Sequence, residues 1–88
     1  MKKEMKKSAT RRLAIIAGQV KGVQDMVDED AYCVDVIAQI EAIREALSAT
    51  GQIVLKNHLL THVAHKMSHG QVEDATDEML KIYKLAKK

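Results

Sequence analysis

Residues 31–67, AYCVDVIAQIEAIREALSATGQIVLKNHLLTHVAHKM, decide the fold that we expect. Apolar residues and histidines recur in this stretch at steps of three and four, the period of one face of an α-helix. We therefore predict one long helix without a break, although Gly51 within it costs about 1 kcal/mol relative to alanine. Gly70, just beyond, suits the C-terminal cap. The predicted stripe consists of Cys33, Val36, Ile37, Ile40, Ile43, Leu47, Gly51, Val54, His58, His62 and His65.

The segments on either side predict two further helices. Each shows apolar residues at the same helical period, and the acidic run 28–30 separates the first helix from the long one. Asp30 is placed to cap the N-terminus of the long helix. The sequence thus predicts an all-α, three-helix chain with a single domain over residues 1–88. The two flanking faces consist of Leu13, Ile16, Val20, Val23 and Val27 before the long helix, and of Val72, Ala75, Met79, Ile82 and Ala86 after it.

The composition supports this fold and indicates that the chain must pack against another chain to bury its apolar residues. The 88 residues include no Pro, Phe or Trp, while 47% are hydrophobic. The core is therefore aliphatic, and a lone chain of this length buries little of it, so we expect self-association. No run approaches the roughly 18 apolar residues of a membrane span. The basic start lacks the apolar run of a signal peptide, and we expect a cytoplasmic protein with no membrane partner.

Three of the four histidines lie in the short stretch 58–65, HLLTHVAH. His58 and His62 are four residues apart, so their imidazoles project from one face of a helix and can share a metal ion. The same spacing also occurs by coincidence or as a satisfied polar contact. Two facts favour a metal: an unpaired buried imidazole is costly, and Cys33, the only cysteine, lies on the same stripe.

Helix geometry restricts how these residues can meet. Cys33 and His58 are 25 positions apart, which is about 37 Å along a continuous helix at ~1.5 Å per residue. They cannot bind one ion within a single chain. In an antiparallel homodimer, however, each cysteine end would meet the histidine end of the partner, and the two-fold axis would create two equivalent sites.

The chain resembles the CsoR/RcnR family of bacterial metal-sensing repressors. The resemblance runs from Arg12 to about Lys84 and rests on GQVKG at 18–22, on YC at 32–33 and on the pair His58 and His62. It implies a three-helix subunit, an antiparallel four-helix-bundle dimer and a dimer-of-dimers tetramer. It also implies a repressor that binds double-stranded operator DNA when metal-free. Metal binding would release the DNA and so derepress efflux or resistance genes.

The resemblance also assigns roles to individual residues. Cys33, His58 and His62 match the metal-ligand positions, and Tyr32 and Glu78 match the Tyr and Glu that the copper branch links to a ligand histidine. One thiolate and two imidazoles suit Cu(I), a soft ion satisfied by few ligands. Ni(II) or Co(II) remains the alternative, because nickel and cobalt sensors have histidine at the position of His62. His65 matches a histidine of that branch, but we expect it to be a polar residue rather than a ligand.

A basic face on the first helix is the candidate DNA-binding surface. Lys3, Lys7, Arg11 and Lys21 fall on the side opposite the apolar face and can neutralise phosphates. By itself such a face is usually only solvated. The resemblance adds Arg12 and Gln19, which match or adjoin basic positions of the family. Residues 14, 15 and 17 (Ala, Ile and Ala) depart from it, because charged residues are common there.

The predicted function is therefore a metal-responsive transcriptional repressor, with Cu(I) favoured as the metal. The first alternative is a nickel- or cobalt-responsive repressor of the same family. A second is a cytosolic metal-binding helical oligomer with no role on DNA. An enzyme is not expected, because the sequence contains no catalytic triad, phosphate loop or acid/base carboxylate pair.

Overall fold

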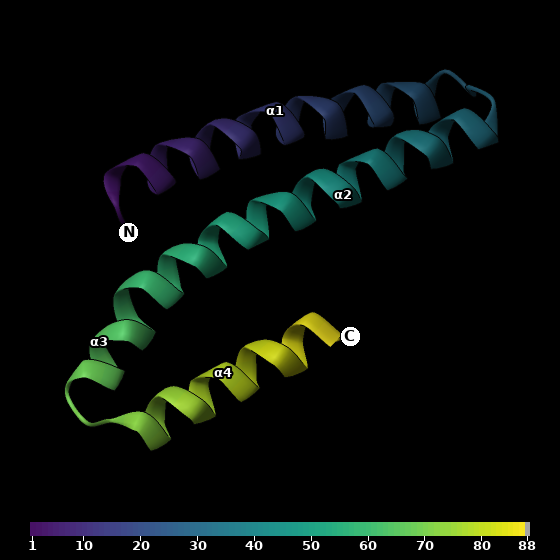
Figure 1. The fold of residues 1–88 in the computed structure, drawn as a ribbon. Helices are drawn as coiled ribbons and strands as arrows, with labels where there is room; N and C mark the ends of the chain where they lie inside the picture. The colour runs from purple at the N-terminus through teal and green to yellow at the C-terminus, as the bar shows by residue number, and fades with distance from the viewer. Residues whose placement is uncertain (88) are drawn as a thin grey trace. The chain divides into compact units, whose positions relative to one another are not determined.

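The computed structural model describes residues 1–87, which are helical apart from short connections and contain no strand (Figure 1). Because α2, η1 and α3 follow one another without a gap, the chain forms three successive helical stretches. The predicted all-α, three-helix fold is confirmed. Lys88, the last residue of the predicted domain, lies outside the described residues. The elements are α1 (Lys3–Asp28), α2 (Cys33–His58), the π-helical turn η1 (Leu59–Val63), α3 (Ala64–Ser68) and α4 (Val72–Lys87).

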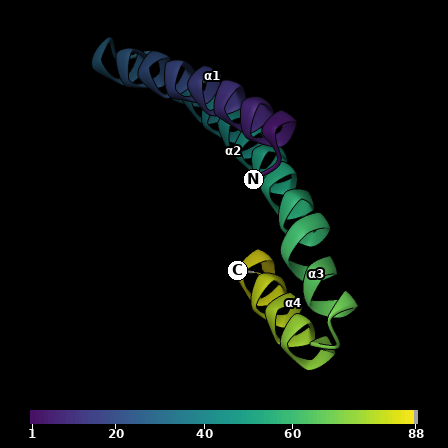
Figure 2. The same ribbon diagram turned by 90° about the vertical axis from the view of Figure 1, so that its left-hand side faces the viewer.

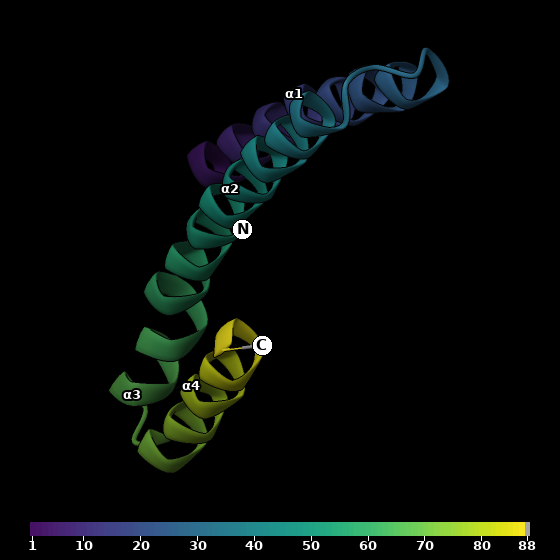
Figure 3. The ribbon, with the colours of Figure 1, turned by 90° about the vertical axis from the view of Figure 1, so that its right-hand side faces the viewer.

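Residues 2–54 form one compact unit. In it α1 and most of α2 run antiparallel and side by side (Figure 2, Figure 3). Ala9 and Ile16 are buried on α1, two turns apart, and Ile43 and Thr50 are buried on α2 at the same spacing. The Thr50 hydroxyl donates to the Ala46 carbonyl at 2.9 Å, so this buried polar group is satisfied.

The connection from α1 to α2 differs from the prediction at Asp30. The N–H groups of Asp30 and Ala31 donate back to carbonyls in the last turn of α1, at 3.1 and 2.9 Å. This Schellman motif holds Asp30 in the left-handed region, with φ 56°. Asp30 therefore ends α1 and does not cap α2, which begins at Cys33 with its first backbone hydrogen bonds to the Tyr32 carbonyl.

Residues 55–88 form most of the second unit, described to Lys87. Here α3 ends in the same motif, with Gly70 at φ 75° and its N–H donating to the Met67 carbonyl at 3.2 Å. The predicted role of Gly70 is confirmed. Val63 of η1 and Ala75 of α4 are buried, and α3 contacts α4.

The long helix differs from the prediction in two ways. Its backbone is not a uniform α-helix, because the five residues of η1 form a π turn. Its apolar stripe is also not a single surface: Val36 is half-buried and Ile43 is buried, whereas a neighbouring arc of α2 is exposed. Among residues 1–87 a Cβ added at Gly51 would meet nothing within 4 Å, so no close approach within one chain requires this glycine. We call the exposed arc the outer arc; it consists of Cys33, Ile37, Ile40, Leu47, Gly51 and Val54.

Many other large apolar side chains are exposed as well. On α4 they include Met79, Leu80 and Leu85. Such extensive apolar exposure on a small chain is typical of a subunit that pairs with other copies. No helix within residues 1–87 has the length and apolar character needed to cross a membrane.

The backbone at Asp30 generates a stability prediction. Glycine adopts positive φ without the Cβ clash that aspartate carries, so Asp30→Gly should raise the free energy of unfolding by about 1 kcal/mol. Asp30→Val should lower it by about 1 kcal/mol. Gly70, which also has positive φ, supplies the control: Gly70→Ala should lower the free energy of unfolding by a similar amount. Urea unfolding at one fixed protein concentration measures all three; a stabilising Asp30→Val would contradict the assignment.

Candidate metal centre

The predicted metal ligands lie at the two ends of α2 and just beyond it. Cys33 is the first residue of the helix and a free, exposed thiol; His58 is the last residue, and His62 lies in η1. Within residues 1–87 no group of three or more His, Cys, Asp or Glu side chains could hold a metal ion. One chain therefore does not assemble the predicted ligand set.

The two histidines are brought together by the π turn. Their ring centroids are 5.0 Å apart and the ring planes are inclined by 32°. A turn closed by i→i+5 hydrogen bonds contains more residues than an α turn, so His58 and His62 come closer to one line along the helix axis. The Thr61 hydroxyl donates to the Asn57 carbonyl at 2.7 Å and gives the backbone a further partner where the wide turn begins.

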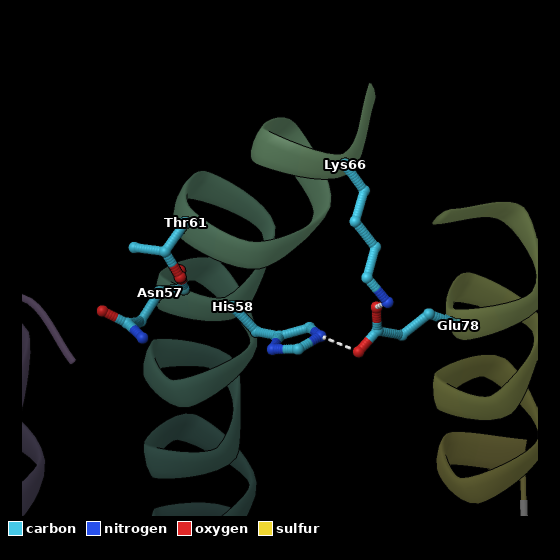
Figure 4. A network of polar contacts seen from close by, with 5 residues as sticks. All are labelled: Asn57, His58, Thr61, Lys66 and Glu78. Carbon is cyan, nitrogen blue, oxygen red and sulfur yellow. Dashed lines mark hydrogen bonds and ion pairs between the residues drawn. The ribbon is translucent and has the colours of Figure 1, made fainter. Parts of the chain in front are cut away.

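Glu78 of α4 bridges the end of α2 and α3 (Figure 4). Its Oε1 lies 2.7 Å from His58 Nε2, and its Oε2 accepts from Lys66 Nζ at 2.9 Å. An ionised carboxylate can only accept, so Nε2 carries the proton of a neutral His58. The other ring nitrogen, Nδ1, then keeps its lone pair for a metal ion.

The charges in this cluster reinforce one another. The hydrogen bond from Lys66 lowers the pKa of Glu78 below its usual value; partial burial opposes this, and the hydrogen bond from His58 adds to it. The same hydrogen bond raises the pKa of Lys66, with Asp74 making a smaller contribution. Glu78 is therefore held as a carboxylate facing the histidine.

The two residues predicted to support the ligands, Glu78 and Tyr32, differ in their surroundings. Glu78 touches His58, as a residue linked to a ligand histidine would. Tyr32 directly precedes Cys33 at the start of α2, and its side chain is 70% exposed. Beside it Cys33 lines a mainly apolar hollow of about 370 Å³, together with Val27, Asp30, Ala31, Val36 and Ile37.

Lys66, which donates to Glu78, is a neighbour of the candidate site that was not predicted from the sequence. It lies eight residues after His58, which on a regular α-helix is about 80° around the axis and so on a different face. Only the wide turn between them alters that spacing. The sequence signal that could have found it is weak, because a lysine near a helix C-terminus is usual for electrostatic reasons alone.

His65 and His69 form a separate pair on and after α3. Their ring centroids are 4.1 Å apart, and His69 Nδ1 lies 2.9 Å from the His65 carbonyl. The His65 carbonyl also accepts from the His69 backbone N–H at 3.2 Å and from the Ser68 hydroxyl at 2.9 Å, so the His69 ring adds to a helix end that is already hydrogen-bonded. This arrangement gives both side chains a structural role, in line with the expectation that His65 is not a ligand, which stays a prediction.

The predicted DNA-binding residues are all exposed on α1. Arg11 lies with Lys3 and Lys7 around a shallow hollow that Lys6 also lines, and Lys6 is a cation that the prediction left out. Lys21 differs, because its Nζ donates to Asp25 at 3.0 Å. The exposed set is Lys3, Lys7, Arg11, Arg12, Gln19 and Lys21.

Comparison with known proteins places this geometry in a family. Residues 5–85 match the family described as metal-sensitive transcriptional repressor. The copper-sensing transcriptional repressor CsoR of Bacillus subtilis (strain 168) is 39% identical over 79 residues, which is 90% of this chain and 78% of that protein. CsoR of Mycobacterium tuberculosis (strain ATCC 25618 / H37Rv) is 35% identical over 83 residues, covering 91% and 70% of the two chains.

A solved structure agrees with these sequence matches. The crystal structure of the copper-sensing repressor CsoR with Cu(I) from Geobacillus thermodenitrificans NG80-2 superposes with a TM-score of 0.91 at 36% identity. The match covers 100% of this chain and 92% of that one. The resemblance that the sequence indicated is thus confirmed, as is the expectation of a repressor rather than an enzyme. With its matching residues, its helical fold and its sequence relatives in agreement, the chain belongs to the family of metal-sensitive transcriptional repressors.

Proposed function

We propose that this protein is a cytoplasmic, Cu(I)-responsive repressor that binds operator DNA when metal-free and leaves it when Cu(I) binds, derepressing copper efflux or resistance genes. The observation that carries the proposal is the 2.7 Å contact between His58 Nε2 and Glu78, which leaves His58 Nδ1 available as a metal donor. The copper-sensing function of the relatives and the Cu(I) in the superposed structure support the choice of metal.

The donor chemistry fits Cu(I). Cys33 supplies a soft thiolate, and His58 and His62 supply neutral imidazoles, a set that satisfies an ion of low coordination number. Ni(II) and Co(II) prefer more donors, and the first nine residues, MKKEMKKSA, contain no histidine that could extend the set. Cys33, His58 and His62 would hold the ion, whose positive charge would neutralise the thiolate.

The outer arc supports a site made by two subunits. It begins at Cys33, and its line of exposed apolar residues runs along α2 toward His58, the other end of the same helix. Two copies of α2 packed antiparallel through this arc would bury it on both chains. Each Cys33 would then meet the histidine pair of a partner subunit, and the two-fold axis would repeat the site. We propose this dimer, and a tetramer formed by pairing two dimers.

Glu78 offers a route from the metal to the rest of the fold. With His58 Nδ1 bound to a cation, the Nε2–H group becomes a stronger donor and tightens its hydrogen bond to Glu78. The stronger bond would connect α4 more firmly to the end of α2. A metal that weakens DNA binding in this way is itself bound more weakly by the DNA-bound repressor, since the coupling is reciprocal.

The exposed cations of α1 support the DNA-binding part of the proposal. They form a basic surface around Lys7 and Arg11, where neutralised phosphates would supply most of the affinity and a steep dependence on salt. Among residues 1–87 only two tyrosines are aromatic, so base stacking contributes little. Phosphate contacts and DNA shape would then dominate recognition.

A mixture of two variants tests whether the site lies between subunits. Cys33→Ala and His58→Ala should each abolish tight Cu(I) binding. When the two are co-expressed, random pairing should make roughly half of the dimers mixed, each with one complete site, and restore about a quarter of the wild-type capacity. Cu(I) titration against a chelator measures it. A mixture that binds no more than the separate variants would contradict the shared site.

The third ligand position distinguishes copper from its rivals. His62→Cys should preserve release of DNA by Cu(I), because a thiolate is an equally suitable soft ligand, whereas His62→Ala should impair it. The measurement is binding to a duplex that carries the promoter next to the gene, at buffered levels of Cu(I), Ni(II) and Co(II). Release of wild-type protein by Ni(II) or Co(II) alone would favour the rival metal. Metal binding without any promoter binding would favour a metal-binding oligomer.

Salt dependence tests the basic face. Lys7→Ala and Arg11→Ala should each weaken promoter binding and reduce the slope of log affinity against log salt by about 0.9, one phosphate contact each. Lys84→Ala, which removes an exposed cation from α4, is the matched control and should leave the slope unchanged. Asp25→Ala should strengthen binding, because it frees Lys21 from its ion pair. Equal effects of the α1 and α4 variants would contradict this interface.

A further inference from the structure

We propose that Lys66 is a positioning residue of the metal site. Through Glu78 it fixes the orientation of the His58 imidazole and sets how strongly metal binding is coupled to DNA release. This inference rests on the proposed function, and it assigns the role to a residue of α3 that is neither a ligand nor a direct neighbour of the ion.

The geometry shows a carboxylate held at both oxygens. Oε1 of Glu78 accepts from His58 Nε2 at 2.7 Å and Oε2 accepts from Lys66 Nζ at 2.9 Å (Figure 4). The side chains of His58, Lys66 and Glu78 are 29%, 34% and 26% exposed, so the cluster is half-buried. With Oε2 occupied, the carboxylate cannot rotate freely, and Oε1 stays directed at the imidazole.

The π turn is what brings Lys66 to this position. On a regular α-helix Lys66 would lie about 80° around the axis from His58. A π turn accommodates roughly one extra residue and turns everything after it back by about 100°, so the two side chains come onto nearly the same face. Both can then reach one residue of α4. Such single turns inside α-helices are frequent at functional sites.

Stability alone does not account for the ion pair. Exposed and half-exposed pairs contribute little to folding, and Lys66 has other carboxylates close at hand. Asp74 and Asp77 line the same hollow of about 200 Å³ with Lys66, Glu78 and Lys81. Lys66 nevertheless donates to Glu78, the carboxylate that also faces His58. The specific partner, rather than the presence of a salt bridge, indicates a role in the site.

The direction of the effect follows from this restraint. Without Lys66, the Glu78 carboxylate loses one of its two fixed partners, and the His58–Glu78 hydrogen bond is formed for less of the time. The imidazole can then turn or adopt its other tautomer, which removes Nδ1 from the ligand position. Loss of a group that orients a ligand typically weakens metal binding by about 10–100-fold. Acting one step further away, Lys66 should account for roughly three- to tenfold.

The experiment compares two lysines of the same hollow in the full-length chain. Lys66→Met should weaken Cu(I) binding by roughly three- to tenfold and reduce the change in promoter affinity caused by Cu(I). Lys81→Met removes an equal charge from the same hollow without a bond to Glu78 and should stay within about twofold of wild type. Lys66→Arg keeps a donor for Oε2 and should restore most of the affinity.

A double-mutant cycle shows whether Lys66 acts through Glu78. Glu78→Gln should weaken Cu(I) binding, and Lys66→Met should cause little further loss in that background, because the carboxylate it orients is gone. NMR of the imidazole nitrogens in the metal-free protein supplies an independent readout. Wild-type His58 should carry its proton on Nε2, and Lys66→Met, but not Lys81→Met, should shift it toward a mixture of tautomers.

The outcomes separate this inference from the proposed function. Wild-type release by Cu(I), together with identical behaviour of Lys66→Met and Lys81→Met, would overturn the role of Lys66 and leave the repressor proposal standing. Additive losses in the cycle would also overturn it, since Lys66 would then act by another route. If Cu(I) fails to release wild-type protein, the proposed function fails, and the NMR comparison still decides whether Lys66 orients His58.

Discussion

The separation of Cys33 from His58 by the length of α2 is the constraint on which the rest of this protein depends. The thiol lies at the first residue of α2 and the imidazoles lie at and just beyond its last residue, so at ~1.5 Å per residue a continuous helix keeps them too far apart to bind one ion within a chain. The same helix carries an exposed apolar arc between those ends. Burial of this arc and the proposed metal site would both be achieved by the arrangement proposed above, an antiparallel pair of α2 helices.

Glu78 extends this arrangement from the ligands to the rest of the second unit. One carboxylate contacts the end of α2 through His58 and α3 through Lys66, while it belongs to α4. A small change at the imidazole therefore acts on two further elements at once. In the proposed repressor this connection would let a bound ion favour one of two states of the protein through differences in contacts.

Much of the fold was predictable from the sequence, because it depends on the local period of apolar residues and on the residues that end helices. The steps of three and four defined the helices, and Gly70 marked the end of the second stretch through its tolerance of positive φ. The predicted role of Asp30 as the N-cap of the long helix was wrong, because aspartate suits both an N-cap and the left-handed position after a helix. Only the hydrogen bonds of the Schellman motif distinguish the two roles.

The sequence by itself determined that the chain is helical, that Cys33, His58 and His62 form the candidate ligand set, and that one chain cannot assemble them, because helix rise and residue spacing are local properties. The tertiary structure decided which apolar residues of α2 face α1 and which remain exposed, because neighbouring arcs of a helix look alike until another helix covers one. It also decided the π turn, and with it the meeting of Lys66 and His58 at Glu78. These contacts join residues far apart in sequence, and no local period encodes them.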